Sequence, residues 1–270
     1  IEYENHIAKE QQRGKLNIGS VIKYYPDFVN AEKTGSLNDL NIYDRNELEK
    51  ILVDKPDTIE ISLLVDGSGS MRGERMTMAR AAATLLMLSI KDFNDELDYR
   101  RKETHSKLRA NTEVLMYGNN FETIKGFEKQ KDYDHNGNEA EIVSSVSKMQ
   151  SEYGGTYDEL PLREVRNEIN ESQREQIRNG KLLKIVFEIT DGATSTEDRS
   201  RQLVQELIQD GVLTFAFQIG DVDNQERKTF ESVWNNDGMD NGILIGEDDI
   251  STLPKKLIEV LRGVLKKIRI

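Results

Sequence analysis

Three oxygen-bearing side chains, those of Asp66, Ser68 and Ser70, alternate with glycines at one point of this sequence. They directly follow the apolar run of residues 63–65, which predicts a buried strand that ends in a tight turn permitted by glycine. The turn places one carboxylate and two hydroxyls on a single loop. Because Mg²⁺ and similar hard cations prefer such oxygen donors, the motif predicts a site for a small divalent cation.

Two further motifs, far along the chain, supply oxygen donors of the same kind. The first is Thr156, which follows Gly154 and Gly155 after an amphipathic run. The second is Asp191, which follows the strand-like run of residues 185–190 and precedes a glycine. The candidate metal ligands are therefore Asp66, Ser68, Ser70, Thr156 and Asp191.

Each motif also has an ordinary structural interpretation when it is taken alone. Ser70 is a suitable helix cap and Thr156 a suitable turn residue, because their hydroxyls can bond to nearby backbone groups. Glu74 and Asp158 lie near the motifs and could tune an ion, but a solvated surface position is the favoured interpretation for both. The joint occurrence of all three motifs favours metal binding.

A second candidate cation site is the loop of residues 132–138. Asp132, Asp134 and Asn136 precede a glycine there, which copies the first half of an EF-hand calcium loop. The twelfth position, which should carry a bidentate glutamate, is Val143 instead. A polar turn that needs no calcium is therefore the preferred interpretation, and calcium binding by this loop stays open.

Other chemistries find little support in the sequence. The three histidines, at positions 6, 105 and 135, are isolated in polar surroundings, and the chain has no cysteine. Neither Ser68 nor Ser70 lies in a Gly-x-Ser-x-Gly nucleophile motif, and no Gly-Lys-Ser/Thr sequence follows to form a phosphate loop. We therefore predict no catalytic residues and no enzymatic activity.

Strand-like and helix-like runs alternate from residue 58 onwards, which predicts a parallel sheet covered by helices on both faces. The expected class is α/β, a doubly wound and mostly parallel sheet with one antiparallel edge strand. Ligands of such sheets bind beyond the carboxyl ends of the strands, where Asp66 and Asp191 are expected. The expected strands are 59–65, 112–117, 122–126, 182–189, 212–219 and 243–245. The expected helices are 74–93, 140–150, 159–178, 198–209 and 253–267.

Residues 1–56 differ from the rest of the chain because they are polar and mixed and carry no motif with evident chemistry. Residues 2–15 and 46–52 are expected to be helical. The chain starts at Ile1 and not at a methionine, so this segment is expected to be an N-terminal extension or linker from a larger protein. The main domain is expected to span residues 57–270.

Composition limits the classes of partner. The 270 residues carry a net charge of −12, which argues against nucleic acid because phosphate binding needs a basic surface. The absence of cysteine favours a cytoplasmic location, although a bacterial extracellular domain can also lack cysteine. No apolar run approaches the ~20 residues needed to span a bilayer, so no membrane segment is expected in this chain.

The three motifs together resemble the metal-ion-dependent adhesion site of von Willebrand factor A (VWA) domains, which have a Rossmann-like fold. The order Asp-x-Ser-x-Ser, Gly-Gly-Thr and Thr-Asp-Gly fits that family, and the resemblance covers roughly residues 57–268. It implies that Mg²⁺ is the cofactor, with Mn²⁺ or Ca²⁺ as alternatives. In the family the two serines ligate directly, the threonine directly or through water, and the two aspartates mainly through water.

The resemblance also implies a protein partner. In the family one coordination position stays open to solvent, and an Asp or Glu of the partner fills it. The run of residues 66–75 is similar to that of intracellular VWA domains in chelatase subunits and in proteins that work with MoxR-type AAA+ ATPases, which implies an AAA+ ATPase partner. Two alternatives stay open: an extracellular adhesion domain, and a metal-dependent hydrolase that would need a general base near the open position.

Overall fold

The computed structural model divides the chain into two compact units, Ile1–Asp54 and Lys55–Ile270. The residues that the structure describes are 2–11, 15–16, 20, 23, 43–51, 56–104, 108–127, 135–192, 194–236 and 238–267. No helix within these ranges has the length and the apolar character that crossing a bilayer requires.

The first unit contains a small antiparallel sheet. Strands β1 (Glu2–Gln11), β2 (Lys15–Leu16) and β3 (Tyr43–Ile51) lie in the order β1-β3-β2. The helices expected at residues 2–15 and 46–52 are therefore wrong. Local composition favours helix in these segments. They form strands because β1 pairs with β3, which is distant in the sequence, and local propensity contains no information on such pairing.

Six strands form the sheet of the second unit. They are β4 (Thr58–Asp66), β5 (Arg109–Tyr117), β6 (Phe121–Lys125), β7 (Leu182–Thr190), β8 (Leu213–Ile219) and β9 (Gly242–Ile245). Their order across the sheet is β6-β5-β4-β7-β8-β9, and all neighbours are parallel except β5 and β6. The mostly parallel sheet with one antiparallel edge strand is therefore confirmed.

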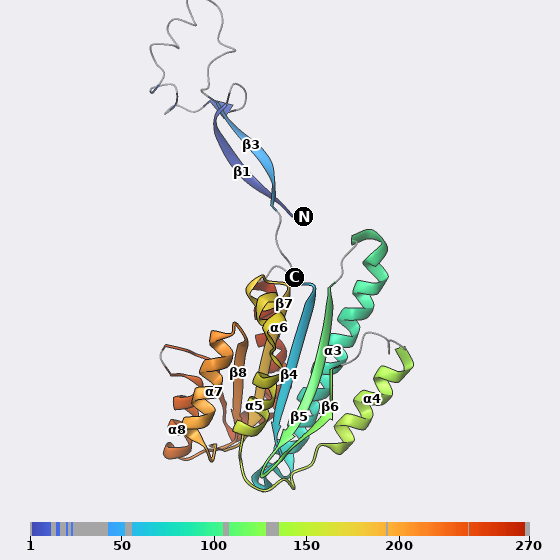
Figure 1. The fold of residues 1–270 in the computed structure, drawn as a ribbon, viewed down its shortest axis with the longest axis vertical. Helices are drawn as coiled ribbons and strands as arrows, with labels where there is room; N and C mark the ends of the chain where they lie inside the picture. Colours follow the sequence, from blue (N-terminus) through green and yellow to red (C-terminus); the bar gives the residue numbers. More distant parts are fainter. Residues whose placement is uncertain are drawn as a thin grey trace, which may run out of the picture. The chain divides into compact units, whose positions relative to one another are not determined.

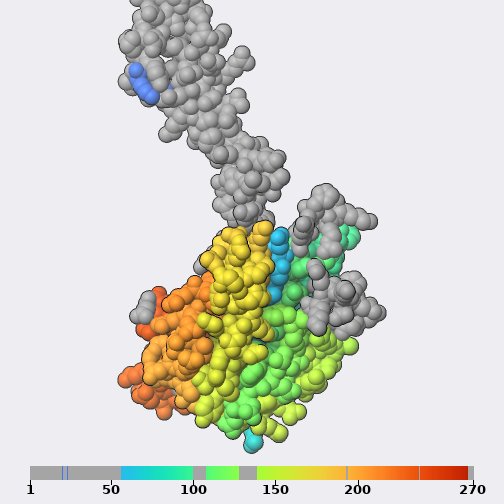
Figure 2. Space-filling model, viewed as in Figure 1, coloured from blue at the N-terminus to red at the C-terminus, as the bar shows by residue number. Residues whose placement is uncertain are grey.

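Helices cover both faces of this sheet, which confirms the doubly wound α/β class (Figure 1). One face carries α3 (Glu74–Thr104), α4 (His135–Lys148) and α9 (Leu253–Lys267), and the other carries α5 (Glu159–Glu168), α6 (Glu171–Arg178), α7 (Glu197–Gln209) and α8 (Asn224–Trp234). Leu63 and Phe187 of the sheet belong to the first core, and Leu64 and Val186 to the second. Figure 2 shows the second face, where the helices from α5 to α8, coloured yellow to orange, cover the strands.

Helix α3 continues beyond its expected end at residue 93 to Thr104, and α4 begins before residue 140. Two further helices differ from the expected pattern. The run expected as one helix over residues 159–178 is broken at Asn170, whose side chain caps α6 by accepting a hydrogen bond from the Gln173 N–H. Helix α8 was not expected, although Asp223 and Glu226 form a capping box at its start. This Asp-x-x-Glu spacing is a helix signal that the sequence does contain.

A polar layer is buried on the face of the sheet that carries α5. The fully buried Lys184 places its Nζ 3.1 Å from Glu60 Oε2 and 3.6 Å from Glu168 Oε2. In the same layer, Ser62 Oγ donates a hydrogen bond to Glu113 Oε1. Desolvation raises the pKa of Glu113 to about 7, and the hydrogen bond from Ser62 opposes this rise only in part.

Replacing Glu113 with Gln is expected to stabilise the fold at alkaline pH and to leave it nearly unchanged at about pH 4. Because the pKa of Glu113 rises from 4.5 to about 7 on folding, its contribution to stability is complete below about pH 4.5 and is lost as the pH rises to about 7. Chemical unfolding of Glu113→Gln should therefore show a gain of about 2 kcal/mol at alkaline pH only. The control is Glu141→Gln on the exposed side of α4. An equal gain for both variants, or a gain at both pH values, would contradict this assignment.

Candidate metal centre

The first loop begins where β4 ends, at Asp66. The Ser68 N–H donates to Asp66 Oδ1 at 2.7 Å, so the carboxylate bonds to its own loop. The 3-10 helix η2 (Gly69–Met71) follows, and its buried Met71 anchors the loop in the core. The hydrogen bond and the buried Met71 thus fix the backbone of the loop that carries the Asp66 carboxylate and the hydroxyls of Ser68 and Ser70.

The second loop packs directly against the first. The Tyr153 N–H donates to the Gly67 carbonyl at 2.9 Å, and Ser68 forms an isolated parallel β-bridge with Gly154. Gly154 has a φ of 90°, in the left-handed region that favours glycine. Thr156 is half-buried on the same loop, close after this bridge.

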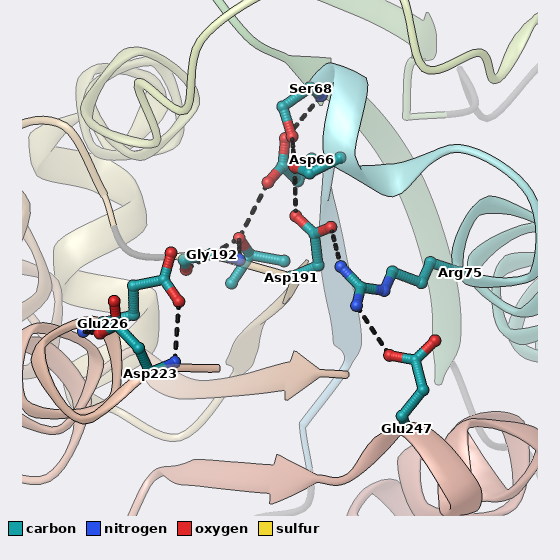
Figure 3. Close-up of polar contacts among 10 residues, drawn as sticks. Asp66, Ser68, Arg75, Asp191, Gly192, Asp223, Glu226 and Glu247 are labelled. Atoms are coloured by element: carbon teal, nitrogen blue, oxygen red, sulfur yellow. Dashed lines mark hydrogen bonds and ion pairs between the residues drawn. The ribbon is translucent and has the colours of Figure 1, made fainter. Parts of the chain in front are cut away.

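The third loop follows β7 and meets the first through side chains (Figure 3). Thr190 Oγ1 donates to Asp66 Oδ2 at 2.9 Å, and Ser70 Oγ donates to Asp191 Oδ1 at 2.8 Å. The Oγ atoms of Ser68 and Ser70 lie 2.9 Å apart. The structure therefore joins four of the five candidate ligands in one continuous hydrogen-bonded chain.

Thr156 is the candidate ligand outside this chain. Among the described residues, its hydroxyl makes no hydrogen bond to the other four candidates. Its backbone carbonyl accepts a hydrogen bond from the Ser195 N–H at 2.8 Å, which ties the second loop to the third. The three loops are thus in mutual contact. The second loop, which carries Thr156, contacts the other two through backbone hydrogen bonds.

The carboxylates of this centre are buried, whereas part of its hydroxyl side is open to solvent. Asp66 is 0% and Asp191 is 4% exposed, while Ser70 is exposed. Desolvation raises the pKa of Asp66 to about 6, the charge of Asp191 adds to the rise, and hydrogen bonds from Ser68 and Thr190 oppose it. Ionising Asp66 in this environment is therefore costly unless a positive charge lies beside it.

A small divalent cation fits this set of donors. Among the described residues no basic side chain pairs with Asp66, so a bound cation would relieve the cost of burying its charge. Within the same residues, no three His, Cys, Asp or Glu side chains gather in a way that would hold a metal. A cation here would therefore depend on the hydroxyl oxygens of Ser68, Ser70 and Thr156, which are hard donors suited to Mg²⁺.

Asp158 was expected on the solvated surface, but it is only 2% exposed. Its Oδ1 accepts hydrogen bonds from Ser200 Oγ at 2.5 Å and from Thr194 Oγ1. Desolvation raises the pKa of Asp158 to about 6, against the effect of these hydrogen bonds. Asp158 thus holds the loop after Asp191 against the start of α5, a role that no local pattern indicates. Glu74 is exposed, as expected.

Glu188 is a second buried acid whose role the sequence did not reveal. Tyr117 Oη donates to its Oε1 at 2.8 Å, while its Oε2 has no hydrogen-bond partner among the described residues. Desolvation raises the pKa of Glu188 well above its ordinary value, and the charges of Asp158 and Asp66 add to this rise. Glu188 is buried because β7 is a central strand whose residues are buried on both faces of the sheet.

The alternative calcium loop can be followed only in part. Asp132 and Asp134 lie outside the described residues. Asn136 lies in the first turn of α4, which begins at His135. An EF-hand loop needs a sharp turn at its glycine, and the backbone at position 137 is helical instead. The polar turn expected over residues 132–138 is therefore wrong for residues 135–138, which are helical, and its earlier part lies outside the described residues.

Comparison with protein families and curated proteins gives two matches of different scope. The model of the von Willebrand factor type A domain matches residues 60–242, a range that contains all three loops. An uncharacterized protein of Treponema pallidum (strain Nichols) is 32% identical over 256 residues, which are 95% of this chain and 42% of that protein. The chain therefore spans less than half the length of this relative.

Solved structures share the fold at low sequence identity. Proximal thread matrix protein 1 from the mussel byssus has a TM-score of 0.52 at 15% identity over 78% of this chain and 47% of that one, and one of its structures has zinc in the metal-ion-dependent adhesion site. The corresponding domain of the pilus tip protein Mfa5 from Porphyromonas gingivalis has a TM-score of 0.56 at 10% identity, over 78% of this chain and 96% of that one. At these identities the likeness concerns the fold alone.

Proposed function

The chain belongs to the von Willebrand factor type A domain family, and on that premise we propose that it is a metal-dependent protein-binding module without enzymatic activity. A divalent cation would be held at the carboxyl edge of the sheet, and a protein partner would supply an acidic side chain to it. The proposed ligands are Asp66, Ser68, Ser70, Thr156 and Asp191.

The observation that carries this proposal is the hydrogen-bonded chain that runs from Asp66 through Ser68 and Ser70 to Asp191. It gathers hard oxygen donors from residues as far apart as Ser70 and Asp191, which are separated by 121 positions. The buried carboxylates would balance the charge of a cation, and a partner would reach it from the side of Ser70, which is exposed.

A bound ion would supply positive charge and a coordination position for an anionic oxygen. Mg²⁺ and Mn²⁺ suit a small set of hydroxyl and carboxylate donors, and Ca²⁺ is the alternative because it also takes oxygen ligands. The zinc-containing site of the mussel protein supports a divalent ion in this fold. Since three of the proposed donors are neutral hydroxyls, the ion would remain electrophilic and would favour an acidic side chain over a neutral one.

The nature of the partner is a further part of the proposal. An AAA+ ATPase and a cytoplasmic location are suggested by the resemblance of residues 66–75 to intracellular domains of this family. Residues 1–56 would then connect the module to the rest of a larger protein, in keeping with the short span of the chain on its relative. An extracellular adhesion module would use the same site with a different partner.

Selection of peptides on the immobilised chain tests the proposed function. A random peptide library is bound in the presence of Mg²⁺ and eluted with EDTA, and the same selection is run on Asp66→Asn as the matched control. The eluted peptides are expected to be enriched in an Asp or Glu at one position, with no such enrichment on the variant. Peptides that stay bound in the presence of EDTA, or that bind the variant equally well, would show that the domain recognises partners by another surface.

A further inference from the structure

Arg75, in the first turn of α3, connects the third loop of the candidate centre, which carries Asp191, to a more distant segment. Its Nη1 donates to Asp191 Oδ2 at 2.6 Å and its Nη2 donates to Glu247 Oε2 at 2.7 Å. Figure 3 shows the guanidinium group lying between these two carboxylates. Glu247 begins the 3-10 helix η3 (Glu247–Thr252), so one cationic side chain bridges three segments that are far apart in the sequence.

The bridge is closely packed. The exposed fractions of the side chains are 22% for Arg75, 0% for Asp191 and 43% for Glu247. Gly220, which follows β8, has a φ of 94°, and a Cβ at this position would lie 2.7 Å from Arg75 Cζ and 2.8 Å from Glu247 Oε2. The missing side chain of Gly220 therefore leaves the space that the ion pair occupies.

This contact limits what Asp191 can offer to a cation. Oδ2 is bound to Arg75, whereas Oδ1 accepts the hydrogen bond from Ser70 Oγ at 2.8 Å. Only Oδ1 is therefore directed toward the hydroxyls of the first loop. A carboxylate that shares its charge with a guanidinium through a short, charge-assisted hydrogen bond is a weaker donor to a metal ion.

Arg75 also changes the charge around the centre. Asp66 and Asp191 contribute two carboxylates, and the guanidinium places one positive charge in contact with the second of them. Positive charge near the ion weakens cation binding and strengthens the attraction of an anionic ligand. Glu247 opposes this effect, but it is more exposed than Asp191, so solvent screens its charge more strongly.

From this geometry the structure assigns Arg75 as a positioning residue that lowers the affinity of the centre for its divalent cation and raises the affinity of the loaded centre for a carboxylate ligand. The inference rests on the proposed function, because it concerns the same centre. The competing explanation is an ion pair that only holds α3 to η3. Such a pair would contribute to stability without changing either affinity.

Three variants of the full chain separate these explanations: Arg75→Gln, Arg75→Lys and Glu247→Gln. Mn²⁺ affinity is measured by calorimetry, and acetate binding to the Mn²⁺-loaded protein by the relaxation of water protons. Arg75→Gln is expected to bind Mn²⁺ about tenfold more tightly and acetate about tenfold more weakly, because one positive charge is lost. Arg75→Lys keeps the charge and should stay within about threefold of the wild type. Glu247→Gln should bind Mn²⁺ about threefold more weakly.

Opposite shifts of Mn²⁺ affinity in Arg75→Gln and Glu247→Gln would support the inference. Shifts in the same direction, or an unchanged affinity with a lower thermal midpoint in the absence of metal, would show a purely structural ion pair. If Arg75→Gln does not fold, tighter Mn²⁺ binding by Glu247→Gln would overturn the inference by itself. If the wild-type chain binds no Mn²⁺, the proposed function is overturned as well. If the wild type binds Mn²⁺ and Arg75→Gln binds it with the same affinity, this inference alone is overturned.

Discussion

Replacing Asp66 with Asn is expected to lower the affinity for Mg²⁺ and Mn²⁺ by at least about a hundredfold while the fold stays intact. The amide keeps an oxygen that can accept the hydrogen bond from the Ser68 N–H, which is 2.7 Å long in the wild type. It removes, however, the negative charge that a cation requires. Since burial raises the pKa of Asp66 to about 6, the neutral variant should be at least as stable as the wild type at alkaline pH in the absence of metal.

Thermal unfolding with and without metal measures both parts of this expectation. A cation at about 100 times its dissociation constant for the wild type should stabilise the wild type by about 2.7 kcal/mol and Asp66→Asn by no more than about 0.4 kcal/mol. Asp92→Asn, on the exposed side of α3, is the control for a carboxylate lost elsewhere. If the Asp66 variant responded to Mg²⁺ as the wild type does, the cation would have to bind at another place.

The meeting of the first and third loops could be predicted because Asp66 and Asp191 each lie at the end of a strand. Asp66 ends β4, Asp191 follows β7, and these strands are parallel neighbours in the sheet. Parallel strands carry their carboxyl ends on the same edge, so a local pattern was sufficient to place side chains together that are far apart in the sequence. The burial of both faces at the end of β4 follows in the same way from the continuous apolar run of residues 63–65.

Contacts that depend on how loops pack against each other could not be predicted in this way. Arg75 looks like any polar residue in the first turn of an amphipathic helix, and its contact with Asp191 spans 116 positions. Asp158 looks like an ordinary residue before a helix, yet its partners lie 36 and 42 positions further along the chain. The spacing of residues within one segment carries no information about such partners. The same reason explains why the strands of the first unit were expected to be helices.

Loop packing also makes Gly118, which is not a candidate ligand, a sensitive position. A Cβ at Gly118 would lie 2.3 Å from the carbonyl oxygen of Tyr153 and 2.5 Å from its carbonyl carbon. The Asn119 N–H donates to the same carbonyl at 2.7 Å, and the Tyr153 N–H donates to Gly67 at 2.9 Å. The turn between β5 and β6 therefore supports the loop that carries Thr156.

Gly118→Ala is accordingly expected to destabilise the fold by about 3 kcal/mol and to lower Mn²⁺ affinity about tenfold, because the backbone of Tyr153 must move and Thr156 moves with it. Gly69→Ala is the matched control, since no atom lies within 4 Å of a Cβ at that position, and its stability should change by less than about 0.5 kcal/mol. Urea unfolding without metal and Mn²⁺ calorimetry measure the two effects separately. If Gly118→Ala lost stability but kept its Mn²⁺ affinity, the cation would depend on the first and third loops alone, and Thr156 would have to be removed from the set of ligands.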